Sequence, residues 1–260
     1  MIALYVLSIL FIATLIRSAF GFGEALIAVP LLAFFIPLGV AAPLAVLVSI
    51  TVAAIVVVQD WEKIHLLSTG WLVFSTLFGI PLGLLLLMNS HQRLVKGTLA
   101  VIIMAFACYA LFDHGIFDKN KIGKKTSGRA PLELKEDHRG WLLVCGFLAG
   151  VLGGAYGMNG PPLVVYGAMR RWSAPHFRAT LQGYFLPASI IGMGGYWMAG
   201  LWTSTVTHYY LLSLPVTLLG VFLGRVINHR IRGEAFVKYL YFALAGIGAL
   251  LLAQAVSGRF

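Results

Sequence analysis

Charged side chains are scarce in this sequence. Asp, Glu, Lys and Arg make up 11% of the 260 residues, whereas a soluble globular domain carries about 25%. Hydrophobic residues account for 60%, and the mean hydropathy is +0.90. A chain of this composition would expose large apolar patches in water, so we expect the lipid bilayer to be its solvent. The scarcity of charge argues against soluble folds and favours an all-α polytopic membrane protein.

The sequence also lacks the patterns that mark catalytic, metal or nucleotide sites. It contains no Cys/His group with metal-ligand spacing, no Walker phosphate loop and no GxSxG nucleophile motif. Cys108 and Cys145 each lie inside an apolar run and are interpreted as small buried hydrophobic residues. We therefore expect no cofactor, no metal, no enzymatic activity and no ATP-driven pumping by this chain alone. An intramembrane enzyme stays open only if an acidic or His pair converges on one cavity.

Long polar stretches are nearly absent as well. The only one spans 113–139, with seven Lys or Arg and five Asp or Glu residues. We interpret it as a cytoplasmic linker between a first membrane repeat, 1–112, and a second, 140–260. The formal net charge is +10, but the basic residues lie in short loops, where they set membrane orientation. Because no basic face with interleaved aromatic residues is present, we expect no nucleic-acid partner.

Ten apolar segments make up the rest of the chain. The third to fifth and the eighth to tenth are about 18 to 23 residues long, enough to cross ~30 Å of hydrocarbon. The others are shorter or interrupted, so the first with the second, and the sixth with the seventh, are predicted to form hairpins that enter the membrane and return. The ten segments are approximately 2–17, 24–37, 41–58, 69–88, 95–112, 140–156, 160–169, 178–200, 205–224 and 235–256.

The two halves of the chain resemble each other. Three short stretches recur in the same order with offsets of 141, 142 and 136 residues, which indicates internal duplication; the pairs are 76–83 with 217–224, 94–97 with 236–239, and 20–21 with 156–157. If the linker is cytoplasmic, the loops on that side hold fifteen Lys and Arg residues and the outside segments hold three. This bias places the N-terminus outside and inverts the second half, which predicts a 5+5 inverted repeat.

Two GxxxG pairs lie at equivalent places in the halves, Gly79 with Gly83 and Gly220 with Gly224. Small residues at this spacing let helix backbones approach closely. They could form a dimer seam or pack the two halves of one chain together, and we favour packing within the chain. Whether the protein is a monomer or a homodimer is left open.

Short glycine-bearing breaks at 18–24 and 155–162 interrupt the first apolar hairpin of each half. Broken hydrophobic segments at corresponding places in two halves indicate a transport site. We therefore expect the two breaks to meet near the middle of the bilayer. The breaks belong to the stretches GFGEALIAVPLL at 21–32 and GGAYGMNGPPLV at 153–164.

These stretches resemble the TauE/SafE family of sulfite and organosulfur anion exporters. The stretch at 21–32 is similar to the family's glycine-rich G-x-G-G-G-x-x-x-V-P-x-L pattern, and the stretch at 153–164 resembles the partner copy of that pattern. Glu24 stands where the family pattern usually has glycine, and Asn159 with Pro161 and Pro162 replaces a plainer glycine run. The resemblance covers the chain apart from the linker, and it implies a membrane transporter that exports sulfite or an organosulfonate.

Half-helices that begin at Glu24 and Gly160 would present unpaired backbone N–H groups and positive dipole ends to a shared anion. Alternatively, the glycines only mark tight turns between helices. On the first interpretation, the candidate substrate-binding residues are Arg17, Gly21, Phe22, Gly23, Glu24, Tyr156, Gly157, Met158, Asn159, Gly160 and Gln182.

Ionisable residues inside a membrane segment are costly and usually have a partner. One hypothesis is that Arg17 neutralises the anion while Glu24 takes and releases a proton. A second is that Arg17 and Glu24 form an ion pair that holds the hairpin. A third is that Arg17 extends to the membrane interface.

Polar residues in the third and eighth segments are candidates for the transport pathway, although Ser and Thr more often bond to their own helix backbone. They are Ser49, Thr51, Thr180, Gln182, Tyr184 and Ser189, of which Gln182 is the favoured one. Arg178 is expected at the cytoplasmic mouth, where it would attract anions.

Together these features predict a secondary transporter in the cell inner (plasma) membrane that exports a small sulfur-containing oxyanion by alternating access, with Glu24 as the candidate for proton coupling. The alternatives are a transporter of carboxylates or other anions, and an anion channel.

Overall fold

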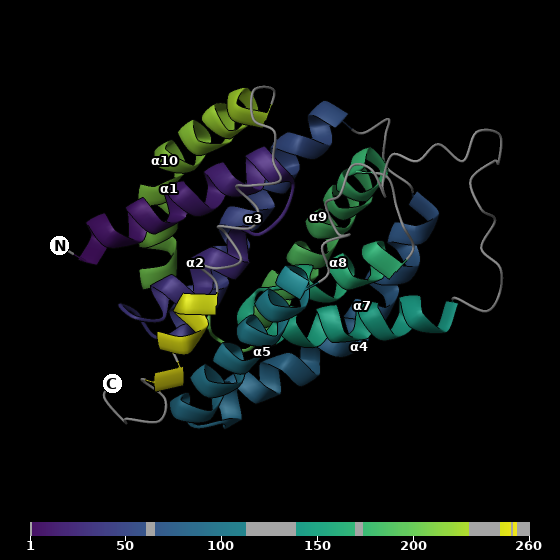
Figure 1. Cartoon of the computed structure of the whole chain (residues 1–260). Coiled ribbons are helices and arrows are strands. Elements are labelled where there is room, and N and C mark those ends of the chain that lie inside the picture. The colour runs from purple at the N-terminus through teal and green to yellow at the C-terminus, as the bar shows by residue number, and fades with distance from the viewer. Residues whose placement is uncertain are drawn as a thin grey trace, which may run out of the picture.

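The computed structural model of the chain describes residues 2–60, 66–112, 139–169, 174–228, 245–250 and 252–253. Within these ranges the regular structure is entirely helical, and the helices pack into one bundle (Figure 1). The helices are α1 (Ile2–Phe20), α2 (Glu24–Leu32), α3 (Leu38–Asp60), α4 (Leu66–Asn89), α5 (Gln92–Phe112), α7 (Arg139–Tyr156), α8 (Gly160–Met169), α9 (Ala174–Met198) and α10 (Ser204–Asn228). Residues 245–250, within the tenth predicted segment, are also helical. The predicted linker falls almost wholly outside the described residues.

Four of the described helices carry stretches long and apolar enough to cross a membrane: Ile2–Ala19, Leu38–Val58, Thr69–Asn89 and Ser204–Ile227. This confirms a polytopic helical membrane protein. The sequence pattern predicts that the first segment is among the short ones, and that prediction is wrong. Helix α1 continues for 19 residues, through Arg17 to Phe20. It continues because the charge of Arg17 is balanced inside the fold instead of ending the helix at a membrane surface.

The two breaks in the chain separate a long helix from a short one. Helix α2 has nine residues and α8 has ten, so each is about 15 Å long and spans roughly half of the hydrocarbon layer. Glycines with positive φ, at Gly21 (88°), Gly23 (97°) and Gly157 (67°), make the two turns. Other residues rarely adopt these angles. Because α2 packs back against α1 and α8 against α7, each predicted break joins a long helix to a short one that folds back on it; that these hairpins enter the membrane and return stays a prediction.

The GxxxG pairs pack helices of the same chain against each other. Helix α4 lies along α7, and α10 lies along α1 (Figure 1). A Cβ atom added at Gly79 or Gly83 would overlap the α7 backbone, and one added at Gly224 would overlap the α1 backbone. The preference for packing within the chain is confirmed at these positions. The fourth helix of each predicted half thus contacts the first helix of the other, as a two-fold relation requires; the duplication, its inversion and the division at 113–139 stay predictions.

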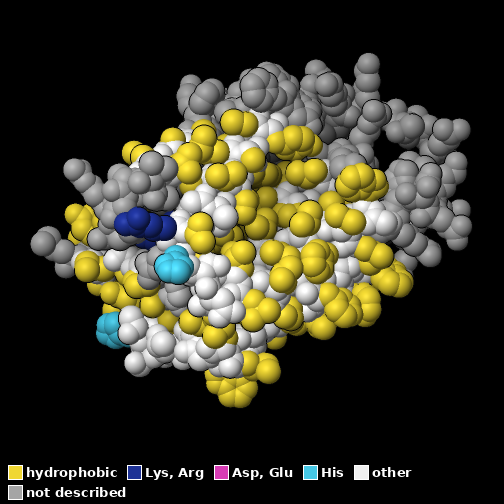
Figure 2. Space-filling view, turned by 90° about the horizontal axis from the view of Figure 1, so that it is seen from below, with side chains coloured by type: hydrophobic (Ala, Val, Ile, Leu, Met, Phe, Trp, Pro, Cys, Tyr) yellow, Lys and Arg dark blue, Asp and Glu magenta, His cyan; other side chains and the backbone are white. Residues whose placement is uncertain are grey.

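Helix α3 lies in the interior of the bundle and contacts α2, α9 and α10. Leu44, Ala45 and Val48 on this helix are completely buried. The outer face of α4 and α7 carries large exposed hydrophobic side chains instead, among them Trp71, Phe74, Phe78, Trp141, Phe147 and Leu148. Figure 2 shows hydrophobic side chains over much of the described part of one face, with basic side chains and histidines visible toward its left side. Such a surface suits contact with lipid.

Candidate functional site

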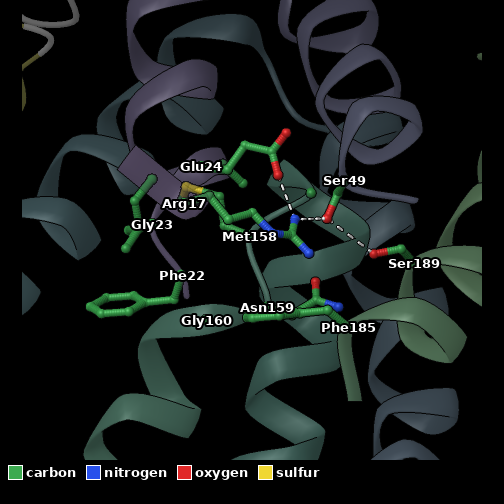
Figure 3. Close-up of a pocket in the computed structure, with 13 residues that line it drawn as sticks. Arg17, Phe22, Gly23, Glu24, Ser49, Met158, Asn159, Gly160, Phe185 and Ser189 are labelled. Carbon is green, nitrogen blue, oxygen red and sulfur yellow. Dashed lines mark hydrogen bonds and ion pairs between the residues drawn. The ribbon is translucent and has the colours of Figure 1, made fainter. Parts of the chain in front are cut away.

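The two chain breaks meet at one small cavity. Its lining comes from α1, the first break and the start of α2, α3, the second break and the start of α8, and α9 (Figure 3). The cavity has a volume of about 20 Å³, which is room for about one water molecule. The lining residues are Arg17, Phe22, Gly23, Glu24, Ala25, Leu26, Ser49, Gly157, Met158, Asn159, Gly160, Phe185 and Ser189.

The guanidinium group of Arg17 occupies the centre of this site. Its side chain is 3% exposed, and its Nη1 atom donates to a carboxylate oxygen of Glu24 and to the hydroxyl of Ser49. A buried charge requires such a partner, because removal from water is expensive. The ion pair proposed from the sequence is therefore present. The alternative in which Arg17 extends to the membrane interface is wrong, since the side chain is enclosed by the bundle.

The ion pair leaves several polar atoms unused. Among the described residues, Nε and Nη2 of Arg17 and Oε1 of Glu24 are buried and have no hydrogen-bond partner. An arginine has five N–H donors in a planar fork, and Nε and Nη2 carry three of them. A buried donor without a partner destabilises a protein by about 1–3 kcal/mol. The guanidinium thus has donors available for a further acceptor in the cavity.

The N-termini of α2 and α8 both open onto the cavity. The lining includes Gly23, Glu24 and Ala25 at the start of α2, and Asn159 and Gly160 at the start of α8. The first turn of a helix has N–H groups without intrahelical partners and carries a partial positive charge. Pro161 and Pro162 follow Gly160 and have no backbone N–H, so α8 contributes mainly through its dipole. Together with Arg17, the two helix ends stabilise a small oxyanion when Glu24 does not neutralise the guanidinium.

Asn159 lies across the guanidinium from Glu24 (Figure 3). Its side chain is 7% exposed and packs directly against Gly153, where an added Cβ would overlap the Asn159 amide. The carbonyl of Gly153 also accepts a hydrogen bond of 2.9 Å from the Tyr196 hydroxyl. The last turn of α7 therefore holds Asn159 in place at the edge of the cavity.

Helices α3 and α9 each contribute a serine. The hydroxyl of Ser189 donates to that of Ser49 over 3.5 Å, a long and weak hydrogen bond. Phe185, four residues before Ser189 on the same face of α9, places its ring under the guanidinium of Arg17. Phe185 is not among the residues predicted from the sequence.

Two of the predicted binding residues do not line the cavity. Gly21 makes the turn after α1, and its N–H donates to the Arg17 carbonyl at 2.6 Å. The Tyr156 hydroxyl contacts α5, where it donates to the Val95 carbonyl at 3.1 Å and bonds to Thr98. Phe22 lines the cavity, although its ring points away from Arg17 (Figure 3).

The remaining pathway candidates are Thr51, Thr180, Gln182, Tyr184 and Arg178. Thr51 contacts the Leu47 carbonyl and the Tyr210 hydroxyl, and Tyr184 bonds to Thr76 at 2.7 Å. Thr180 is buried with no hydrogen-bond partner among the described residues. The side chains of Gln182 and Arg178 lie outside the described residues, so their predicted roles stay predictions.

Comparison with known proteins places the chain in a family. A family profile described as "Sulfite exporter TauE/SafE" matches residues 6–251. No curated protein and no solved structure matches the chain. The matched range includes both breaks, every residue that lines the cavity and most of the described helices. The chain therefore belongs to the TauE/SafE sulfite exporter family and is a membrane protein of an anion-transporter type.

Proposed function

We propose that this protein exports a small sulfur-containing oxyanion, such as sulfite or an organosulfonate, across the cell inner membrane by alternating access. The observation that carries the proposal is the position of Arg17. This buried cation, with donors unused among the described residues, lies beside the N-termini of two half-helices. An arginine and two helix N-termini, deep in an apolar bundle, supply N–H groups that replace the water an anion loses on entering the site.

The small size of the cavity supports alternating access over an open channel. A cavity of about 20 Å³ is too small for an oxyanion of four or more heavy atoms, since it holds about one water. Arg17 and Glu24 are 3% and 2% exposed. The site must therefore enlarge and open before an anion enters, which is the behaviour of a carrier with an occluded state.

Glu24 gives this carrier a means of coupling to protons. It is a carboxylate in the transport site, in contact with the cation that would bind the substrate. If it takes a proton when the anion binds Arg17, the two cross the membrane together and the charge of the site is conserved. This role of Glu24 is part of the proposal, together with the outward direction of transport.

The test is uptake and efflux of sulfite and methanesulfonate in proteoliposomes that contain the purified protein. A saturable flux, faster with an imposed pH gradient and lost in Arg17→Gln, supports the proposal. A large current that does not saturate with anion concentration would instead indicate a channel. Saturable transport of acetate with no response to either sulfur anion would redirect the proposal to carboxylates.

A further inference from the structure

The carboxylate of Glu24 occupies the position beside Arg17 that an incoming anion requires. We propose that Glu24 is a tethered competitor of the substrate, so that Glu24 and the transported anion take turns as the partner of the Arg17 guanidinium. This inference rests on the function proposed above and specifies how that site is regulated.

The geometry of the ion pair supports exchange. An arginine and a carboxylate that serve only to hold two helices together form two parallel hydrogen bonds when they can, because the bidentate arrangement is the stronger one. Here one nitrogen, Nη1, contacts one oxygen, Oε2, and the same nitrogen also contacts Ser49. Nε and Nη2 of Arg17 and Oε1 of Glu24 have no partner among the described residues. Glu24 and Ser49 therefore occupy only Nη1, and the N–H groups of Nε and Nη2 remain available to another acceptor.

The hairpin does not depend on this pair for its packing. Helix α2 buries Leu26, Val29 and Leu32 almost completely against its neighbours, and it contacts both α1 and α3. Burial of one such side chain stabilises a structure by about 1.5–3 kcal/mol in water, and in a bilayer the same close packing supplies dispersion contacts. Glu24 can therefore leave Arg17 while α2 stays in place.

A released Glu24 carboxylate has a favourable place to go. Glu24 is the first residue of α2, and the residue before it, Gly23, supplies no side-chain cap. The first N–H groups of α2 and its positive dipole end stabilise a negative charge at this position. A change of side-chain rotamer moves the carboxylate from Arg17 toward its own helix terminus and vacates space for a ligand. Movement of this one side chain thus enlarges the cavity and leaves the Arg17 guanidinium without its carboxylate partner, as anion binding requires.

Competition of this kind also selects for ligand charge. Among the described residues that line the cavity, Arg17 is the only cation and Glu24 the only anion. A singly charged oxyanion replaces Glu24 on Arg17, and the displaced carboxylate is then balanced by the N-terminus of α2. A dianion would add a further negative charge that no cation among the described lining residues balances, which is expensive at this depth. Methanesulfonate is therefore expected to bind in preference to sulfate.

The experiment measures the Kd of methanesulfonate for purified full-length protein by calorimetry, in the wild type, Glu24→Gln, Ser49→Ala and the double variant Arg17→Gln/Glu24→Gln. Glu24→Gln keeps the size of the side chain and removes the competing charge, so we expect binding at least about tenfold tighter, because the fraction of Arg17 available to the ligand rises. Ser49→Ala removes the neutral partner of the same nitrogen and should not tighten binding. The double variant should lose binding.

The outcomes separate the two proposals. Binding to Glu24→Gln that is equal to or weaker than binding to the wild type overturns the competitor role, and so does an equal gain in Ser49→Ala. No binding to any variant contradicts the proposed function itself. If Glu24→Gln does not fold because Arg17 is left unpaired, Glu24→Asp replaces it. Its carboxylate is one methylene farther from Arg17, so binding tighter than wild type supports the inference and unchanged or weaker binding overturns it.

Discussion

The Cζ atom of Arg17 lies 5.0 Å from the centroid of the Phe185 ring. The central cation of the site, on α1, thus lies between the Glu24 carboxylate of α2 and the aromatic face of Phe185 on α9. The ring attracts the guanidinium without neutralising it, because the attraction arises from the quadrupole of the ring and not from a net charge. Phe185 therefore orients Arg17 and leaves its positive charge available to an anion.

Replacing Phe185 by leucine tests this role. The substitution retains an apolar side chain and removes a cation–π contact of about 0.5–2 kcal/mol, so Phe185→Leu should bind methanesulfonate several-fold more weakly. Phe106→Leu is the matched control, since Phe106 is also a buried phenylalanine but does not line the cavity. Both variants should lower the melting temperature, whereas only Phe185→Leu should change the Kd. A similar change of Kd in both would contradict the orienting role.

Ser49 is predicted to stabilise Arg17 even without ligand. A hydrogen bond to a charged group contributes about 1.5–3 kcal/mol, so Ser49→Ala should lower the free energy of unfolding by about that amount. Thr51→Val is the control on the same helix, because it removes a 2.8 Å hydrogen bond between neutral hydroxyl groups, Thr51 and Tyr210, and should cost about 1 kcal/mol. Unfolding in detergent with added denaturant measures both, and a larger loss in Thr51→Val would refute the prediction.

The seam between α4 and α7 should be sensitive to a single methyl group. An added Cβ at Gly79 would overlap the backbone of α7, whereas one at Gly70, on the same helix, meets nothing within 4 Å. Gly79→Ala is therefore expected to destabilise the protein by about 1–3 kcal/mol through overpacking, while Gly70→Ala should stabilise it by up to about 1 kcal/mol through helix propensity. Thermal unfolding of the two variants should shift in opposite directions, and equal shifts would mean that α4 and α7 do not pack closely.

Much of the site could be predicted from the sequence because its features are unusual for a membrane segment. A glycine-rich interruption and an ionisable pair stand out against long apolar runs, which is why the breaks and the partnership of Arg17 with Glu24 could be anticipated. Phe185 could not be recognised in this way, since one more phenylalanine in an apolar helix carries no distinguishing signal.

Tyr156 is the converse case, a residue that the sequence predicts at the site but whose side chain lies outside the cavity. It directly precedes Gly157, yet successive residues of a helix point about 100° apart, and its hydroxyl reaches α5 instead of the cavity. Sequence proximity to a break identifies the backbone that forms it but not the direction of each side chain. The length of α1 was underestimated for a related reason, because a charge at Arg17 is typical of the end of a membrane segment unless a partner balances it.

The glycines of the two breaks should differ in what they contribute, and alanine substitutions separate the contributions. At Gly157, φ is 67° and an added Cβ would lie 2.9 Å from Val46 Cγ2 and 3.0 Å from the Ala42 carbonyl oxygen. Left-handed strain of about 1–2 kcal/mol and overpacking of about 1–3 kcal/mol then act together. Gly23, with φ of 97° and open space around it, incurs the strain alone, so Gly157→Ala should be less stable than Gly23→Ala. Thermal unfolding of the two variants measures the difference, and equal losses would contradict the close contact with α3.

Substitution of Gly160 by alanine is expected to preserve stability and to weaken anion binding. It lies within α8, and an added Cβ would make an ordinary contact of 3.9 Å with Phe185 Cζ at the edge of the cavity. Gly160→Ala should therefore unfold at or slightly above the wild-type temperature, because alanine is the better helix former by up to about 1 kcal/mol. Its methanesulfonate affinity should nevertheless fall, since the methyl group fills space that the ligand needs. Thermal unfolding and calorimetry on the same samples check both statements, and a stable variant with wild-type affinity would show that the anion does not approach the start of α8.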